Sequence, residues 1–169
     1  MPEIFTKISP MLLIFGVLLI LPIKCQPHQL KALAFSLWLV GGCMLTYLGF
    51  MRLLDPAALS AANVTLSTAL IAGIIGLLIG FGKGRFVLSK TSTKNIERLN
   101  ALSEPLPPRH VYSKRSWIVL SVMVLIALSL NTGLIPLAVY LRGAVNLAIG
   151  FALIISSLTY LSKGKAQAA

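Results

Sequence analysis

Long uninterrupted apolar runs dominate this sequence and limit the folds open to it more than any other feature. Five such runs can be read along the chain, at residues 8–23, 32–54, 61–81, 117–130 and 134–161. A helix needs about 20 apolar residues to cross a hydrocarbon core about 30 Å thick. The second, third and fifth runs reach this length, and the fourth reaches it once Ser116 and Asn131 are included. The sequence therefore predicts an all-α integral membrane protein with about five transmembrane helices.

The charge content excludes several other classes of protein. Charged residues make up 11% of the 169 residues, whereas a soluble domain carries about a quarter. A soluble enzyme, a disordered tail and a secreted disulfide scaffold are all incompatible with this composition. Residues 8–23 form the weakest predicted span, because Pro10 and Pro22 bracket it and Pro22 removes a helical hydrogen bond. A cleaved signal peptide is the alternative, but the sequence after Leu21 lacks a small-x-small cleavage pattern.

The distribution of lysine and arginine predicts how the chain crosses the membrane. If residues 83–115 are cytoplasmic, twelve of the 15 basic residues fall on the cytoplasmic side, and Lys7, Arg52 and Arg142 remain outside. Such a bias is the usual signal of topology. We therefore expect an inner membrane of bacterial type, with the amino terminus outside and the carboxyl terminus cytoplasmic.

The predicted organisation has four parts. Residues 1–82 hold three helices, 83–115 form a basic cytoplasmic segment, 116–162 hold two more helices, and 163–169 form a tail. A shift of about 80 residues places Pro56 on Pro136 and Lys83 on Lys163. The match is compatible with two parallel hairpins related by an axis along the membrane normal. Two independent hairpins of similar composition are the simpler interpretation.

The basic segment contains the first candidate site. The residues expected to contact lipid or a partner are Lys83, Arg85, Lys90, Lys94 and Arg98. The last three are four residues apart and would share one face of a helix. Ile96, Leu99 and Leu102 recur at about helical spacing, which predicts an amphipathic helix resting on the inner leaflet with its apolar stripe towards the lipid. An ordinary positive-inside loop that only fixes topology is the alternative.

After this predicted helix the chain changes character. Pro105, Pro107 and Pro108 stop a helix and favour an extended backbone. We expect a stiff spacer leading into the fourth run. The PxxP spacing of an SH3 ligand is a less specific reading of the same prolines.

Small residues spaced four apart predict close packing of helices. The two sets are Ala72, Gly76 and Gly80 in the third run, and Ala144, Ala148 and Ala152 in the fifth. Small side chains allow another helix to approach closely and gain contacts that lipid does not supply. The sequence leaves open whether this packing is within one subunit or between subunits.

No Asp, Glu or Lys lies well inside a predicted span, and Arg142 is the exception to this absence of charge. Arg142 stands near the outer end of the fifth run, whereas all four acidic residues are peripheral. A snorkelling anchor is the favoured role. An anion site, or an ion pair with Asp55, is the alternative. Asn63 and Asn146 are the polar residues that would join Arg142 in a cavity.

No residue pattern indicates a metal, a cofactor or a catalytic centre. Cys25 and His28 supply two metal ligands where a structural zinc site needs four. Cys25 and Cys43 are predicted to lie at different depths and not to form a disulfide. Nucleic acid is not an expected partner, because the basic charge is explained by membrane orientation. Asn63 opens an N-x-T sequon, which we read as a helix cap.

Taken together, these features predict an interaction protein and not an enzyme. The expected function is that of a small accessory or assembly subunit, which acts through helix packing and a basic cytoplasmic docking segment. Its partners would be the bilayer, anionic lipids, and a protein partner or further copies of itself. The alternative is a small oligomeric permease or channel for a small solute or anion.

Overall fold

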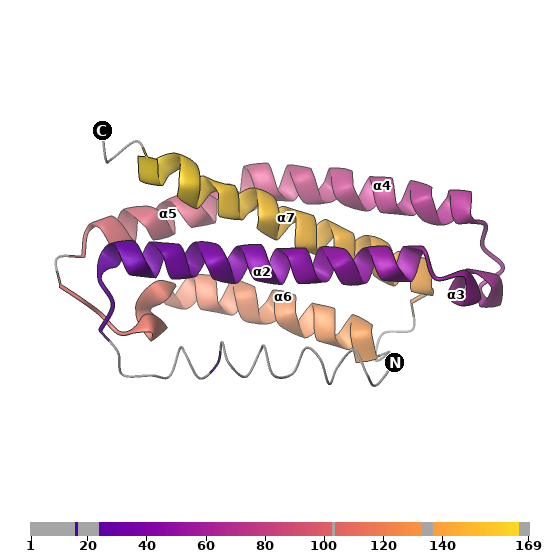
Figure 1. Ribbon diagram of the computed structural model, residues 1–169, viewed down its shortest axis with the longest axis horizontal. Coiled ribbons are helices and arrows are strands. Elements are labelled where there is room, and N and C mark those ends of the chain that lie inside the picture. Colours follow the sequence, from indigo (N-terminus) through magenta and orange to yellow (C-terminus); the bar gives the residue numbers. More distant parts are fainter. Residues whose placement is uncertain (1–15, 17–23, 103, 133–136, 166–169) are drawn as a thin grey trace.

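The computed structural model describes residues 16, 24–102, 104–132 and 137–165 (Figure 1). Its helices are α2 (Pro27–Leu53), α3 (Pro56–Ala61), α4 (Leu66–Lys83), the π-helix η1 (Gly84–Leu88), α5 (Ser89–Asn100), the 3₁₀-helix η2 (Pro108–Val111), α6 (Lys114–Thr132) and α7 (Val139–Lys165). The described residues contain no β-strand, and one isolated bridge joins Cys25 to Leu106. The predicted first span falls outside the described residues.

Among the described residues, three helical segments are long and apolar enough to cross a membrane, and the prediction of an all-α fold is confirmed. They are Pro27–Leu53, Val139–Ser162 and the continuous stretch Leu66–Asn100. The fourth predicted run is also helical and forms α6, but it is not among these three.

Local signals in the sequence explain where two of the long helices begin. Pro27 occupies the first turn of α2, where its missing N–H costs nothing. Just before it, the Gln26 backbone N–H donates to Oε1 of Gln29 at 2.9 Å, as in a capping box. α4 begins after Thr65, whose hydroxyl accepts a hydrogen bond from the Thr68 backbone N–H. The cap is thus Thr65 and not Asn63, which lies in the preceding turn with φ of 50°.

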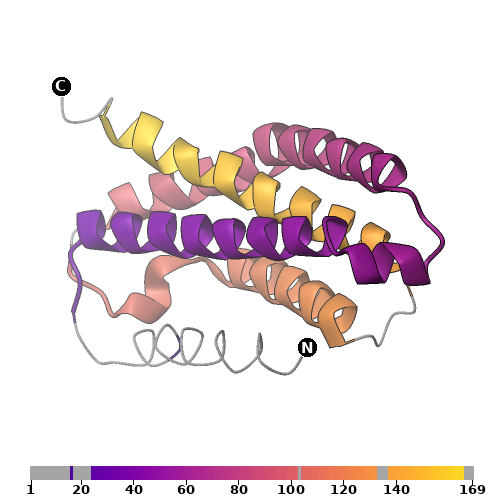
Figure 2. The same ribbon diagram turned by 45° about the vertical axis from the view of Figure 1, so that its right-hand side comes forward.

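The long helices form an up-and-down bundle with α7 at its centre. α2 and α6 run in one direction, while α4 and α7 run in the other (Figure 1). α7 crosses the bundle obliquely and packs extensively on both α2 and α4, as the turned view also shows (Figure 2). Because α7 lies between α2 and α4, its backbone must come close to both of these helices.

The two predicted rows of small residues pack against each other within one chain. The register pairs Gly76 with Ala144, Gly80 with Ala148 and Gly84 with Ala152. A Cβ added at Gly80 would lie 2.5 Å from the carbonyl oxygen of Ala148, and one at Gly84 would lie 2.9 Å from that of Ala152. Both distances are too short for a side chain, so the α4–α7 interface requires glycine. Ala72, the remaining member of the first row, is half-buried.

A second glycine interface joins α2 to α7, and the sequence analysis missed it. A Cβ added at Gly42 would lie 2.8 Å from the Gly150 carbonyl oxygen, and one at Gly49 would lie 2.8 Å from that of Gly143. These glycines are seven residues apart in each helix, a spacing of about two turns. The signal was present in the sequence, but a search for four-residue spacing does not find it.

The helix formed by the third apolar run extends past residue 82, where the predicted basic segment begins. The helix continues through η1 into α5 without a break. In a regular α-helix, each four-residue step turns about 40° past the previous one. Gly76, Gly80, Gly84, Leu88 and Ser92 are nevertheless all buried. A π-turn takes up an extra residue, so it rotates the later positions back towards the bundle.

The two copies of the proposed repeat have different neighbours. α7 packs along α2, but α4 and α6, the corresponding helices, share no comparable contact among the described residues. The pairing that dominates the fold is therefore not repeated, and the resemblance between the two hairpins is one of composition and direction.

The proline-rich segment is docked on the bundle and is more than a spacer. The backbones of Cys25 and Leu106 exchange two hydrogen bonds, of 2.9 and 3.0 Å. Pro108 begins η2, and both Pro108 and Val111 are buried. η2 contacts the beginning of α2, so this segment closes one end of the bundle.

Candidate functional site

Four exposed cations lie along one continuous stretch of helix, at the end of α4, in η1 and in the first half of α5. They are Lys83, Arg85, Lys90 and Lys94. Four of the five basic residues predicted to contact lipid or a partner are therefore exposed, and two of them, Lys90 and Lys94, line one depression. We refer to these four as the basic surface.

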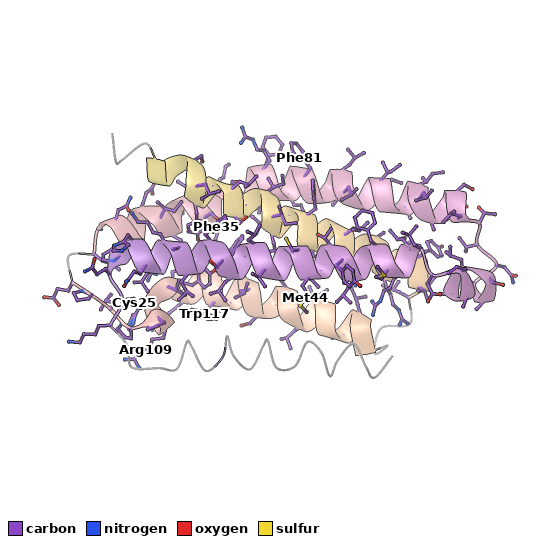
Figure 3. The ribbon with its side chains drawn as sticks, viewed as in Figure 1. Cys25, Phe35, Met44, Phe81, Arg109 and Trp117 are labelled. Carbon is purple, nitrogen blue, oxygen red and sulfur yellow. The ribbon has the colours of Figure 1, made fainter. Side chains whose placement is uncertain are left out.

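Exposed apolar side chains lie next to the basic surface. Apolar residues are exposed along α4 and η1 as far as Phe86 and Val87, which are 69% and 60% exposed. Phe81 of α4 also points away from the bundle (Figure 3). α4 has 18 residues and η1 has five, a length that matches the hydrocarbon core at about 1.5 Å per residue. We call the exposed apolar residues of α4 and η1 the apolar band. Lys90 and Lys94 follow η1 in the chain and therefore lie beyond this band.

A shallow depression lies in the part of the basic surface that α5 contributes. Its volume is about 310 Å³, and it is lined by Ser89, Lys90, Thr93, Lys94 and Glu97. Ammonium and hydroxyl groups can donate hydrogen bonds to an oxyanion. The carboxylate of Glu97 offsets one of the two lysine charges, so the lining as a whole stays positive.

Arg98 does not share this surface, which corrects the prediction that it acts with Lys90 and Lys94. Its side chain is half-buried, and Nη2 donates a hydrogen bond to the backbone carbonyl of His110. Arg98 therefore joins α5 to η2 and has a structural role.

The apolar stripe of α5 faces the protein, which corrects the prediction that it rests on lipid. Ile96 and Leu99 are 2% and 0% exposed, and they belong to the same core as Leu30 of α2 and Leu153 of α7. Leu102 packs at the margin of this core. The bundle itself covers the stripe that the sequence pattern assigned to the inner leaflet.

Buried hydrogen bonds hold α5 against α7. The hydroxyl groups of Ser92 and Ser156 lie 2.7 Å apart. Nδ2 of Asn95 donates to the Tyr160 hydroxyl at 3.1 Å and to the Val111 carbonyl at 2.9 Å. We call this set the α5 clasp. The clasp was not predicted. Its two residues on α5, Ser92 and Asn95, are three positions apart, and this spacing was a signal that one face of the basic helix is buried.

Aromatic residues extend this end of the bundle towards α6. The Tyr112 hydroxyl donates to the Ala34 carbonyl at 3.0 Å, and its ring meets Trp117 edge-on at 5.4 Å. Trp117 donates through Nε1 to the Arg109 carbonyl at 3.2 Å, and both residues lie at the end that also holds Cys25 (Figure 3). Burial raises the pKa of the Tyr112 phenol well above its ordinary value. The phenol is therefore neutral and serves as a structural donor.

The opposite end of the bundle holds the polar residues that the sequence pattern suggested as a cavity with Arg142. Asn146 is fully buried in α7, one turn from Arg142, whereas Asn63 is exposed in the turn before α4. Asn63 therefore does not line a cavity with Asn146. The carboxylate of Asp55 accepts from the Ala57 and Ala58 N–H groups at the start of α3. In the part of the chain that the structure describes, it forms no ion pair with Arg142.

Potential metal ligands and nucleophiles are scattered. Among the described residues, no three His, Cys, Asp or Glu side chains gather closely enough to hold a metal ion. Cys25 is half-buried and Cys43 is exposed, and neither forms a disulfide. No family model, no curated protein and no solved structure matches the chain.

Proposed function

We propose that this protein is a small integral membrane interaction subunit, and that it docks an acidic segment of a partner protein on the part of the basic surface formed by Lys90 and Lys94. The observation that carries the proposal is the contrast between the two faces of α5. One face is fixed to the bundle by the α5 clasp, and the other presents two exposed ammonium groups beside a depression. A loop that only signals topology needs no such rigid support.

The two halves of the basic surface have different roles in this proposal. Lys83 and Arg85 stand among exposed apolar residues, from which they extend to anionic lipid headgroups. Lys90 and Lys94 project beyond the apolar band and meet the partner. Lipid contact fixes the height of the helix, and charge complementarity then selects the partner.

The proposal includes an inner membrane with the α5 end in the cytoplasm and the α3 end outside. The charge distribution supports this orientation. Single cysteines at Lys94 and Ala57 test it, since both positions are exposed. Labelling of the Lys94 site, and not the Ala57 site, by an impermeant reagent on intact cells would overturn the orientation.

Site-specific photocrosslinking tests the docking proposal. A photoreactive residue replaces Thr93, which lines the depression, and the protein is irradiated in native membranes. We expect a protein adduct that K90Q/K94Q removes. K24Q/K114Q is the matched control, because it removes two exposed charges at the same end of the bundle. Lipid adducts alone, or an adduct that survives K90Q/K94Q, would contradict partner docking.

A small oligomeric permease is the second candidate. The observation in its favour is the set of fully buried polar residues on α7, namely Asn146, Ser156 and Ser157. The glycine interfaces on both sides of α7 argue against it, because backbones in contact leave no path between those helices. Solute or anion flux in liposomes that hold the purified protein would favour the permease over the interaction subunit.

A further inference from the structure

Two arginines meet at the α3 end of the bundle, opposite the basic surface. Arg52 lies in the last turn of α2, and Arg142 lies in the first turn of α7. A Cβ added at Gly143 would lie 3.3 Å from the Cβ of Arg52, so the stem of Arg52 lies against the residue next to Arg142. Both side chains carry a positive charge, and like charges on adjoining turns of two packed helices repel each other.

Neither arginine has a counter-ion within the described part of the chain. Asp55, the nearest acid in the sequence, is engaged by backbone N–H groups of α3. Glu97 and Glu104 lie at or beyond α5, at the other end of the bundle. Nη1 of Arg52 and Nε of Arg142 are both buried, and neither has a hydrogen-bond partner. Unpaired N–H groups on two like charges are costly where water is scarce.

A bound oxyanion removes both costs at once. It neutralises the repulsion and accepts hydrogen bonds from both planar guanidinium groups, a geometry for which arginine is suited. The amino-terminal end of α7 also lies here, and its dipole favours negative charge. Met51 and Leu141, the sequence neighbours of the two arginines, are 50% and 39% exposed. The pair therefore borders the lipid-facing surface of the bundle.

We propose that Arg52 and Arg142 together bind a phosphate group at the α3 end of the bundle. The group comes from a phospholipid headgroup or from free phosphate, and both sources present the same oxygen atoms. The site is independent of the basic surface and does not rest on the docking proposal. A snorkelling anchor requires one arginine only, whereas this site requires both.

Thermal unfolding of the full-length protein in neutral detergent tests the proposal and separates the two sources. One arm compares inorganic phosphate with chloride at equal ionic strength. The other compares phosphatidylglycerol with diacylglycerol, which lacks the phosphate. We expect the midpoint of unfolding to rise with at least one phosphate source. A rise with phosphatidylglycerol alone identifies a headgroup, and a rise with inorganic phosphate identifies the free anion.

Variants assign the effect to the two arginines. R52Q/R142Q should abolish the rise, and each single Gln variant should weaken binding about tenfold, as expected for loss of one charge-assisted contact. R52K and R142K keep the charge but lose the planar guanidinium, so they should bind with intermediate strength. They provide the test if a Gln variant fails to fold. K90Q/K94Q is the charge-matched control and should respond like the wild type. The site would be wrong if neither phosphate source raised the midpoint. It would also be wrong if R52Q/R142Q, or R52K and R142K, responded as strongly as the wild type.

Discussion

The apolar helix α4 and its continuation in α5 are held to the same helix, α7, by different means. α4 meets α7 through backbone contact at Gly76 and Gly80, and Gly84 of η1 continues this row. α5 meets α7 through the side chains of the α5 clasp, with Ser92 bonded to Ser156 and Asn95 to Tyr160. The change occurs at η1, within one continuous helix.

The difference follows from the surroundings of each half. In lipid, apolar side chains gain little by turning inwards, so association depends on close packing of small residues. Outside the hydrocarbon, a helix is stabilised by burying apolar groups and by pairing the polar groups buried with them. Accordingly, α4 exposes its large apolar residues, such as Leu78 at 66%, whereas α5 buries Ile96 and Leu99.

Substitution at Gly76 should have the largest effect, because it attacks the backbone contact. Its Cβ would clash with the Ala144 carbonyl oxygen. Gly76→Leu should destabilise the protein by about 3 kcal/mol or more, since overpacking typically costs about 1–3 kcal/mol even without a backbone clash. Gly76→Ala should also be destabilising, although the sequence alone suggests a mild effect. The measurement is thermal unfolding in detergent.

Gly82 is the matched control for this prediction. It lies on the same helix, and a Cβ added there meets nothing within 4 Å. Gly82→Ala and Gly82→Leu should leave the unfolding midpoint nearly unchanged. If the Gly76 and Gly82 variants were equally stable, close packing would not hold α4 to α7.

Removal of the Asn95 side chain should have an intermediate and local effect. Asn95→Ala deletes the hydrogen bonds to Tyr160 and Val111 and leaves buried groups unpaired, at a cost of about 1–3 kcal/mol. Hydrogen exchange should accelerate in α5 and η2, while α4 and α7 near Gly76 stay protected. Lys94→Ala, at an exposed position of the same helix, should change neither region. Equal loss of protection in α4 would mean that the two halves unfold together.

The smallest effect is expected for Tyr112→Phe, which removes one hydrogen bond to the Ala34 carbonyl. Loss of such a bond typically costs about 0.5–1.5 kcal/mol. Because burial raises the pKa of Tyr112 in the folded protein, the folded state retains a proton that the unfolded chain loses near pH 10. Wild-type stability should therefore fall as the pH rises above about 10.

A comparison of the wild type with Tyr112→Phe isolates the contribution of Tyr112 to the pH dependence of stability. Tyr112→Phe should show a smaller fall in stability over the same alkaline range, measured by chemical unfolding. Parallel pH profiles for the wild type and the variant would show that Tyr112 does not contribute to it.

Much of the helical framework could be predicted, because its causes are local. Apolar length identified α2, α4 and α7, but the starts were placed less well, because α2 begins at Pro27 and not near residue 32, and α4 is capped by Thr65 and not by Asn63. The four-residue spacing of Gly76 and Gly80 also indicated a packing face. These properties depend on residues a few positions apart, so a single sequence contains them.

The partners of those faces could not be predicted from spacing. The pattern of Ile96 and Leu99 marks an apolar stripe, but lipid and protein are equally apolar neighbours for it. Only the path of α7 makes the bundle its neighbour. In the same way, Arg52 and Arg142 are far apart in the chain, and nothing local brings their charges together.

The sequence by itself determined that the chain is helical, apolar enough for a membrane, and strongly basic on one predicted side. The tertiary structure decided which cations remain free, since Lys90 and Lys94 are exposed while Arg98 bonds to η2. It also decided that α4 continues into α5 and that α7 lies between two glycine interfaces. The physical reason is that helix formation depends on short-range hydrogen bonds, whereas the choice of neighbour depends on shape and polarity between segments distant in the chain.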